Sequence, residues 1–366
     1  MKQIPSFRKH FPVLTQSTYL NTPAWGLMHE DLLDWRQEQD LDYLVEGSDA
    51  KIRSLALLDQ TRERIGASFH CTPDRVALVP NFSIGLNLLL EGLPRSSKVV
   101  LLEGDYPSVN WPFESRGYPI RTVPLGASVE EELRSVIGEW GADVLALSLV
   151  QWVSGLLIAP AFLKSLKQEF PNLLVVADGT QYLGAFGLDF DAGGIDILGA
   201  SGYKWMLGGN GNGFVMHSPY AETRIDLRAS GFNATGGNLS ASGPIPFARR
   251  LEPGHLDTVS FGSLHLSLGL LQELGLEHVE TYNRRLLAAV HSALSGLGLL
   301  DPVVEGRPEH GTIFNIPDPG GLYKHLRKND LVCSQRGGGI RVGFHCYNTE
   351  NDLDRLVELI RNYRTS

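Results

Sequence analysis

The segment from residue 75 to 217 alternates short apolar runs with longer amphipathic stretches, and this alternation restricts the fold more than any other feature. Strands that are apolar along most of their length are typical of a parallel sheet covered by helices on both faces. The pattern therefore predicts an α/β domain in which crossover helices join parallel strands. The candidate strands are the runs at 75–80, 98–103, 143–150, 172–178, 195–200 and 213–217.

Amphipathic helices are predicted on both sides of these strands, at 29–45, 52–69, 128–140 and 159–170. Ser128 with Glu131 three residues later predicts a capping box at the start of one helix. Beyond residue 262 the pattern changes to one or two long helices up to 296, strand candidates at 311–316 and 339–344, and a closing helix at 349–363. Thr349 can cap this last helix, with Asp352 in its first turn.

The length of 366 residues exceeds what one hydrophobic core usually supports, so we expect two domains. We expect a large domain at 16–255, and a smaller α+β domain formed by 1–15 together with 256–366. The glycine-rich stretch at 231–246 between them predicts a flexible or substrate-facing loop.

Composition excludes several classes of protein. Lys plus Arg total 32 against 41 for Asp plus Glu, and the net charge of -9 without a dense basic cluster disfavours a nucleic-acid partner. Cys71, Cys333 and Cys346 are odd in number and lack metal-ligand spacing, which indicates a reducing compartment and no metal site. The start lacks the apolar core of a secretory signal, and no apolar run approaches the ~20 residues that cross a bilayer. We expect a soluble, cytoplasmic protein without a membrane partner.

Polar residues follow several predicted strands, where open α/β sheets bind their ligands. Asp178 ends the run at 172–178, and Gln181 follows one turn later. Ser83 precedes an apolar helical run, whose first turn offers free amides and a positive dipole end to a phosphate. Tyr106 and Trp152 follow two further strands, at positions from which an aromatic side chain can stack on a planar ring.

The stretch ASGYKWMLGGNGNGFV at 200–215 adds a lysine, Lys204, after another strand. A phosphate seat, an aromatic platform, an acid and a lysine, in that order, are the parts that hold pyridoxal phosphate. The lysine forms a Schiff base with the cofactor, and the acid keeps the pyridine nitrogen protonated so that the ring withdraws electrons.

These motifs resemble the class V aminotransferase family of fold type I pyridoxal-phosphate enzymes, which also holds cysteine desulfurases, selenocysteine lyases and isopenicillin epimerase-like proteins. The resemblance spans nearly the whole chain and rests on NFSIGLN, DGTQ, SGYKWMLGGNGNG and GGGIRVGFHCYNTENDLDRLVELI. It implies a large domain with a mostly parallel seven-stranded sheet between helices, a smaller α+β C-terminal domain, pyridoxal 5'-phosphate as cofactor, and a homodimer with active sites at the subunit interface.

The resemblance also implies roles for single residues around the cofactor. Lys204 carries the Schiff base, and Asp178 and Gln181 meet the pyridine nitrogen and the phenolate oxygen. Tyr106 stacks on the ring, and Trp152 stands where desulfurases tend to have asparagine. The phosphate is held by the amide of Phe82, the amide and hydroxyl of Ser83, Ser201, Tyr203 in place of the usual histidine, and His255 from a loop that crosses to the partner subunit.

On the substrate side, the resemblance implies that Arg341 grips the carboxylate of an amino acid, because a guanidinium can donate two parallel hydrogen bonds to it. Asn21 and Trp25 line the same side. Lys204, once released, acts as general base at Cα. We expect an aminotransferase acting on an amino acid and a 2-oxo acid, with an epimerase or β-lyase as the alternative.

Other activities fit less well. A desulfurase needs a mobile loop cysteine, whereas Cys333 is predicted inside a short strand and Cys346 follows the strand of Arg341. Ser201 and Lys204 also match the S-x-x-K of serine acyl-enzymes, but the companion S-D-N and K-T-G motifs are absent. GGNGNG precedes a strand rather than opening a helix, which argues against a dinucleotide site. A non-catalytic protein that binds the cofactor would not need the carboxylate clamp.

Overall fold

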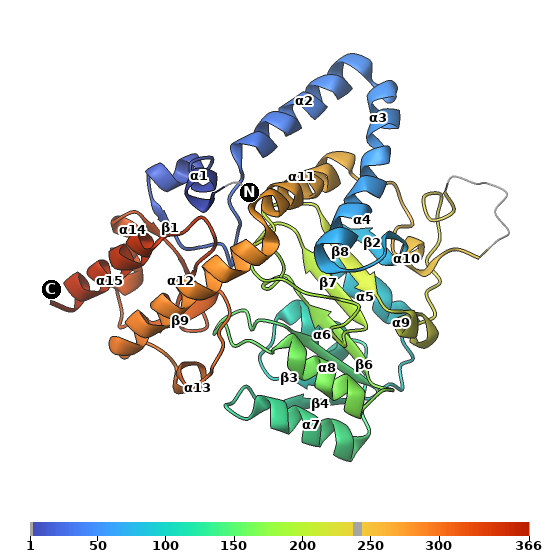
Figure 1. The fold of residues 1–366 in the computed structure, drawn as a ribbon. Helices are drawn as coiled ribbons and strands as arrows, with labels where there is room; N and C mark the ends of the chain where they lie inside the picture. The colour runs from blue at the N-terminus through green and yellow to red at the C-terminus, as the bar shows by residue number, and fades with distance from the viewer. Residues whose placement is uncertain (1–2, 237–243, 366) are drawn as a thin grey trace.

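The structure, a computed structural model, describes residues 3–236 and 244–365; part of the loop predicted at 231–246 lies outside these ranges (Figure 1). Its centre is a seven-stranded sheet of order β2-β8-β7-β6-β5-β3-β4. Only β8 runs antiparallel to its neighbours, so the mostly parallel seven-stranded sheet is confirmed. The strands are β2 (Val76–Val79), β3 (Val99–Leu102), β4 (Ile120–Val123), β5 (Val144–Ser148), β6 (Leu174–Asp178), β7 (Ile197–Ser201) and β8 (Gly213–His217).

The strand β4 was missed by the apolar pattern. It pairs with β3 alone, at the edge of the sheet, and its central Arg121 and Thr122 are exposed. A strand buried on fewer sides needs fewer apolar residues, so its sequence lacks the continuous run that marks the inner strands.

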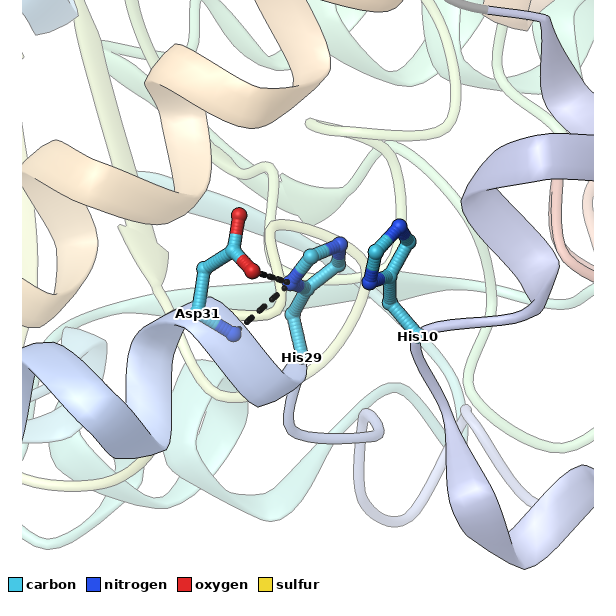
Figure 2. A group of neighbouring side chains, drawn as sticks. All are labelled: His10, His29 and Asp31. Carbon is cyan, nitrogen blue, oxygen red and sulfur yellow. Dashed lines mark hydrogen bonds and ion pairs between the residues drawn. The ribbon is translucent and has the colours of Figure 1, made fainter.

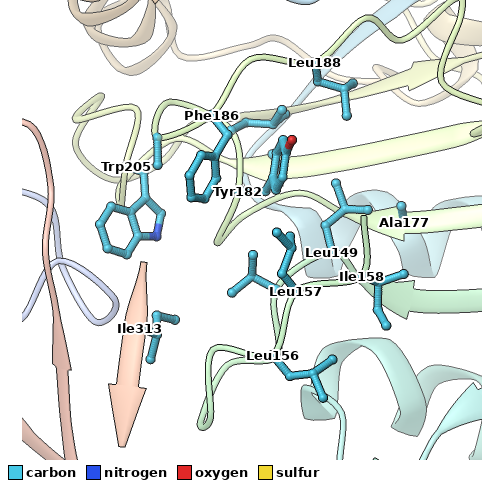
Figure 3. Packing of buried hydrophobic residues seen from close by; sticks show 14 of the residues in the cluster. Leu149, Leu156, Leu157, Ile158, Ala177, Tyr182, Phe186, Leu188, Trp205 and Ile313 are labelled. Carbon is cyan, nitrogen blue, oxygen red and sulfur yellow. The ribbon is translucent and has the colours of Figure 1, made fainter. Parts of the chain in front are cut away.

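Both faces of the sheet are buried, as the apolar runs predicted. In β3, Val99 and Leu101 belong to the core under α5 (Phe82–Gly92) and α6 (Pro107–Glu114), whereas Val100 and Leu102 belong to the core under α7 (Val129–Trp140) and α8 (Pro160–Glu169). This second core continues to the C-terminal part of the chain, since Trp205 and Ile313 both belong to it (Figure 3).

The predicted helices are present, but the run predicted at 52–69 is divided at residue 55. The region predicted as one or two helices up to 296 forms two, separated at Gly275 with φ +84°. The short helices at 4–8, 107–114, 219–224, 247–250, 302–305 and 322–328 were not predicted. The helices are α1 (Ile4–Arg8), η1 (Pro12–Thr15), α2 (Glu30–Glu46), α3 (Ser48–Ser54), α4 (Ala56–Phe69), η2 (Pro73–Arg75), α5 (Phe82–Gly92), α6 (Pro107–Glu114), α7 (Val129–Trp140), α8 (Pro160–Glu169), α9 (Pro219–Arg224), α10 (Phe247–Arg250), α11 (Thr258–Leu274), α12 (Leu276–Gly296), α13 (Pro302–Glu305), α14 (Leu322–Lys328) and α15 (Glu350–Thr365).

One predicted helix cap is wrong, and at the other only the position of Asp352 in the first turn is confirmed. The Ser128 side chain makes no capping bond to α7; its hydroxyl donates instead to Glu132 Oε1 at 2.7 Å, so Glu131 has no capping partner there. At α15, the Thr349 amide donates to Asp352 Oδ2 at 2.7 Å, and Arg8 neutralises the same carboxylate.

The C-terminal region forms the predicted α+β part. Its antiparallel sheet has the order β11-β12-β9, from β9 (Ile313–Pro317), β11 (Ser334–Arg336) and β12 (Gly339–Gly343). A two-stranded parallel sheet joins β1 (Thr18–Tyr19) to β10 (Leu331–Val332), which ties the start of the chain to its end. The domain limits at 16–255, and at 1–15 with 256–366, stay predictions.

Two histidines and an aspartate meet where α2 begins (Figure 2). The buried His29 caps the helix, because its Nδ1 accepts the Asp31 amide at 3.1 Å. Its ring stacks on His10, with centroids 4.7 Å apart and planes 19° from parallel. Lone pairs lie in the plane of an imidazole ring, so two nearly parallel stacked rings do not point theirs at one tetrahedral ion. We assign this cluster to helix capping and packing.

Candidate active site

A cavity of about 430 Å³ lies at the carboxyl ends of β2, β3, β6 and β7. Its position agrees with the rule that open α/β sheets bind ligands at this edge. It brings together residues that the sequence analysis took from four separate segments. The lining consists of Asn81, Phe82, Ser83, Ile84, Tyr106, Asp178, Thr180, Ser201, Tyr203 and Lys204.

Lys204 lies buried in this cavity, with 6% of the residue exposed. Its Nζ is 5.5 Å from the ring centroids of Tyr106 and of Tyr203. The pKa of Lys204 is lowered to about 8, mainly by burial; the negative charge of Asp178 opposes this shift, and the positive charge of Arg341 contributes to it. The amine therefore loses its proton far more readily than that of a surface lysine.

The backbone at Lys204 is held by a close neighbour from the N-terminal segment. The Gly26 amide donates to the Tyr203 carbonyl at 2.8 Å, and a Cβ at Gly26 would lie 2.0 Å from the Lys204 carbonyl oxygen. Glycine is required at residue 26 because any larger residue would displace the lysine loop. The segment after the lysine is fixed by the buried Asn212, whose Nδ2 donates to the carbonyls of Gly208 and Ser260.

Asp178 ends β6 and is buried opposite the amine. Burial raises the pKa of its carboxyl to about 6, although hydrogen bonds from Thr180 and the charge of Lys204 act in the other direction. Its Oδ1 accepts the Thr180 amide at 2.8 Å, and the Thr180 hydroxyl in turn accepts the Ser201 amide at 3.1 Å. The carboxylate is thus fixed in place, and a cationic partner in the cavity would stabilise its charge.

The first turn of α5 closes another side of the cavity. The Phe82 amide donates to Ser201 Oγ at 3.0 Å, and Asn81 caps the helix by accepting the Ile84 amide at 3.0 Å. Ser83 Oγ lies 2.7 Å from Ser108 Oγ. Amides and hydroxyls at a helix N-terminus are the donors that a phosphate requires, so this side fits the phosphate of the predicted cofactor.

Tyr106 and Trp152 form an aromatic corner, with ring centroids 5.8 Å apart in an edge-to-face arrangement. Arg341, on β12, donates from Nη1 to the Trp152 carbonyl at 2.7 Å. Only 4% of Arg341 is exposed, its Nε has no partner among the described residues, and burial lowers its pKa to about 10. A buried guanidinium with a free donor fits an anionic group of a bound substrate.

Six predicted residues lie outside the lining of this cavity: Trp152 and Arg341, described above, and Gln181, Asn21, Trp25 and His255. Gln181 uses its amide within the protein, since Nε2 donates to the Pro23 carbonyl at 3.0 Å and Oε1 accepts the Trp205 indole at 2.7 Å. Asn21 pairs with Gly343 in an isolated bridge and keeps a buried, unpartnered Oδ1. Their roles toward the cofactor and the substrate stay predictions.

The other two are on the surface of the chain. Trp25 is 51% exposed, with its ring 5.9 Å from that of Tyr203. His255 is exposed beside Phe232 and lines a separate cavity of about 710 Å³ next to α2, α3 and α4. His255 and Lys204 line different cavities of the chain, and the role of His255 toward a partner subunit stays a prediction.

Sequence reasoning missed several residues of the site. Asn81, Ile84 and Thr180 line the cavity, and Ser108 supports Ser83 from the start of α6. The helix-capping preference of asparagine before an apolar run was a signal for Asn81. Thr180 and Ser108 gave no local signal, because their partners lie more than twenty positions away in the chain.

The comparisons with known proteins agree with this geometry. Residues 19–321 match the family Aminotransferase class-V, and the chain belongs to that family. Isopenicillin N epimerase from Amycolatopsis lactamdurans is 28% identical over 341 residues, 83% of this chain and 84% of that protein. An uncharacterized aminotransferase from Bacillus subtilis (strain 168) is 23% identical over 371 residues, 98% of each. The apo cysteine desulfurase from Thermococcus onnurineus NA1 has the same fold, with a TM-score of 0.87, 17% identity and coverage of 99% and 98%.

The chain is therefore a class V enzyme of fold type I that uses pyridoxal 5'-phosphate. The observed side chains fit this group, since the cavity offers the Lys204 amine, the Asp178 carboxyl, two tyrosine rings and a helix N-terminus. Within the described residues, no helix has both the length and the apolar character needed to span a bilayer.

Proposed function

We propose that this chain is an aminotransferase that acts on an α-amino acid, with a 2-oxo acid as second substrate. The observation that carries the proposal is that Lys204 is the only amine among the residues lining the cavity. Transamination needs one group that removes the proton from the substrate Cα and returns it to C4' of the cofactor. Epimerisation needs a proton delivered to the opposite face of Cα. Burial raises the pKa of the Tyr203 phenol to about 12, so Tyr203 is poorly suited to be a second base.

Each residue has a separate task in this proposal. Pyridoxal phosphate supplies an electron sink that weakens the bonds at the substrate Cα. Lys204 holds the cofactor aldehyde at rest and, once released, removes the Cα proton in its neutral form. Asp178 keeps a proton on the ring nitrogen by offering it a buried carboxylate. The first turn of α5 with Ser201 holds the phosphate, and Arg341 orients the substrate carboxylate beside Trp152.

The test is a panel of L- and D-amino acids mixed with the purified holoenzyme and a 2-oxo acid. We expect a new 2-oxo acid and a new amino acid in equal amounts. The same samples are analysed for inverted amino acid on a chiral column, and for ammonia and sulfide. Inversion or elimination without amino transfer would reject the aminotransferase assignment.

Epimerisation is the second candidate, and the relative that favours it is the isopenicillin N epimerase, 28% identical over most of both chains.

Desulfurase chemistry that uses a cysteine as persulfide carrier has less support. All three cysteines of the chain are buried, and burial raises the pKa of Cys71 to about 11 and of Cys333 to about 12. Cys333 lies between β10 and β11, not inside a strand as predicted, and remains enclosed. A thiol acts as nucleophile through its thiolate, which burial disfavours here.

Substitution of Arg341 separates substrate binding from the rest of the chemistry. We expect Arg341→Ala to lower kcat/KM for amino acids by about 100-fold, because charge-assisted hydrogen bonds to the carboxylate are lost. Turnover of the corresponding amines, which have no carboxylate, should change by less than threefold. Arg336→Ala is the matched control, since Arg336 lies on the neighbouring strand β11 but is exposed. An equal loss of activity with amino acids and with the corresponding amines would show that Arg341 does not bind the substrate carboxylate.

We propose that the active form is a homodimer. Of the large apolar side chains exposed on α2 and α3, five lie between residues 41 and 52, a segment that also contributes residues to the cavity that His255 lines. A second copy of the chain would cover them. His255 would then contact the phosphate in the partner's site. Sedimentation equilibrium measures the mass directly, and a monomer with full activity would reject the proposal. The five residues are Leu41, Tyr43, Leu44, Val45 and Ile52.

A further inference from the structure

Asp105 is a buried carboxylate that the roles given above leave unused. It lies after β3, beyond the turn at Gly104 with φ +66°, and directly before Tyr106. Among the described residues no ion pair to it is found, and only 5% of it is exposed. A buried carboxylate without a cation is costly unless hydrogen bonds satisfy it. Its retention at this position calls for a local reason.

Both oxygens of Asp105 accept backbone amides from the active-site edge of the sheet. Oδ1 accepts the Tyr106 amide at 2.6 Å, and Oδ2 accepts the Ser148 amide at 2.7 Å. Ser148 is the last residue of β5, and its register partner on β6 is Asp178. One side chain therefore ties the loop that carries the Tyr106 ring to the strand end beside the acid of the site.

The same carboxylate acts on Asp178 through its charge. Burial raises the pKa of Asp178 first, and the negative charge of Asp105 adds to this increase. Burial also raises the pKa of Asp105 itself, whereas the hydrogen bonds from Ser148 and Tyr106 oppose that change. Two neighbouring carboxyls in one buried region favour a cation placed beside them, such as a protonated ring nitrogen.

We propose that Asp105 is a positioning residue that fixes the Tyr106 ring over Lys204 and supplies a second negative charge behind Asp178. The cofactor ring then meets an aromatic face held by the sheet rather than by a free loop, together with a stronger negative potential at its nitrogen. This inference rests on the proposed roles of Lys204 and Asp178.

Two variants separate position from charge. Asp105→Asn keeps the size but removes the charge and one of the two acceptors. Asp105→Glu keeps the charge but is one methylene longer, so it cannot hold both amides in the same geometry. Asp196→Asn is the matched control. Asp196 is also buried and accepts the Val175 amide at 2.9 Å, but it lies directly before β7, at the end of the sheet opposite the cavity.

The readouts are kcat, KM and the pH midpoint of the visible absorption band of the bound cofactor. We expect Asp105→Asn to lower kcat by about tenfold with a smaller change in KM, and to move the midpoint down by several tenths of a pH unit, because a cationic form loses a nearby negative charge. Asp105→Glu should keep the midpoint but lower kcat. Asp196→Asn should leave both unchanged, whatever it does to the melting temperature.

The proposal would be overturned if Asp105→Asn left the pH midpoint unchanged and kept kcat within twofold of the parent enzyme. An equal shift of the midpoint in Asp196→Asn would also overturn it. If Asp105→Asn does not fold, Asp105→Glu decides by its kcat. If the proposed roles of Lys204 and Asp178 were wrong, the result would be distinguishable, because the parent enzyme itself would then lack the visible absorption band or turnover.

Discussion

Replacing Lys204 by alanine should abolish turnover, by about 10⁴-fold or more, and remove the visible absorption band of the bound cofactor. The variant loses both the amine that bonds the aldehyde and the general base, and a positioned base alone contributes about 10²–10⁴-fold. The side chain occupies the cavity rather than the core, so the fold should persist. Spectroscopy and steady-state kinetics on the same preparation measure both losses.

Lys98→Ala is the control for this variant. Lys98 also lies next to a strand of the large sheet, but its amine donates to the Trp140 carbonyl at 3.0 Å, far from the cavity lining. It should keep the band and the rate. A Lys204→Ala protein with more than a hundredth of the parent activity would contradict the assignment of Lys204.

The lowered pKa of Lys204 gives a further check on the same residue. Only the neutral amine attacks the aldehyde, so cofactor uptake by the apo protein should accelerate as pH rises and level off above about pH 8. An ordinary lysine would level off only near 10.5. Stopped-flow absorbance at a series of pH values measures the midpoint.

The second large effect is expected from Asp178→Ala, which should lower kcat by about 100- to 1000-fold while the cofactor remains bound. A preorganised charge at a buried position contributes about 3–4 kcal/mol to a transition state when its partner develops or holds charge. Without the carboxylate, the ring nitrogen loses its proton and the electron sink weakens. Kinetics together with the cofactor content of the purified variant test this result.

The isosteric Asp178→Asn should be nearly as inactive as Asp178→Ala, because shape alone does not replace the charge. Asp143→Asn is the control, since Asp143 accepts the Lys98 amide at 2.9 Å beyond the other end of β5. The pKa of Asp178 is raised to about 6, so the carboxylate forms above that pH and is lost as pH falls through it. A protonated ring nitrogen beside it lowers this value, which places the acid limb of kcat at or below pH 6. Activity of Asp178→Asn within tenfold of the parent enzyme would remove Asp178 from the mechanism.

The sequence predicted the sheet and the residues at its edge because both depend on local patterns. Apolar runs marked the strands buried on two faces, and a polar residue after each run marked the site, as at Asp178 and Lys204. The edge strand β4 was not predicted, because its exposed residues Arg121 and Thr122 interrupt the apolar run. The capping box at Ser128 failed because the hydroxyl has a better-placed partner one residue further, Glu132.

Short sequence patterns could not predict contacts between segments that lie far apart in the chain. Trp205 directly follows Lys204, yet it is fully buried, packs against the His345 ring and donates to Gln181. Nothing in its neighbours distinguishes it from a residue that faces the cavity. The link from Asp105 to Ser148 spans 43 positions and likewise has no counterpart in any short motif.

The pairing of β1 with β10 has a consequence for the order in which the molecule is completed. The segment that holds Gly26 against the Lys204 loop is itself anchored by residues 331–332 and 343, and by the bond from Asn348 to the Tyr19 carbonyl. A ribosome releases these anchors more than a hundred residues after the lysine. During synthesis, the large sheet can therefore form while the wall beside the lysine is still missing. The wall beside the lysine is complete only once residues 331–348 are in place.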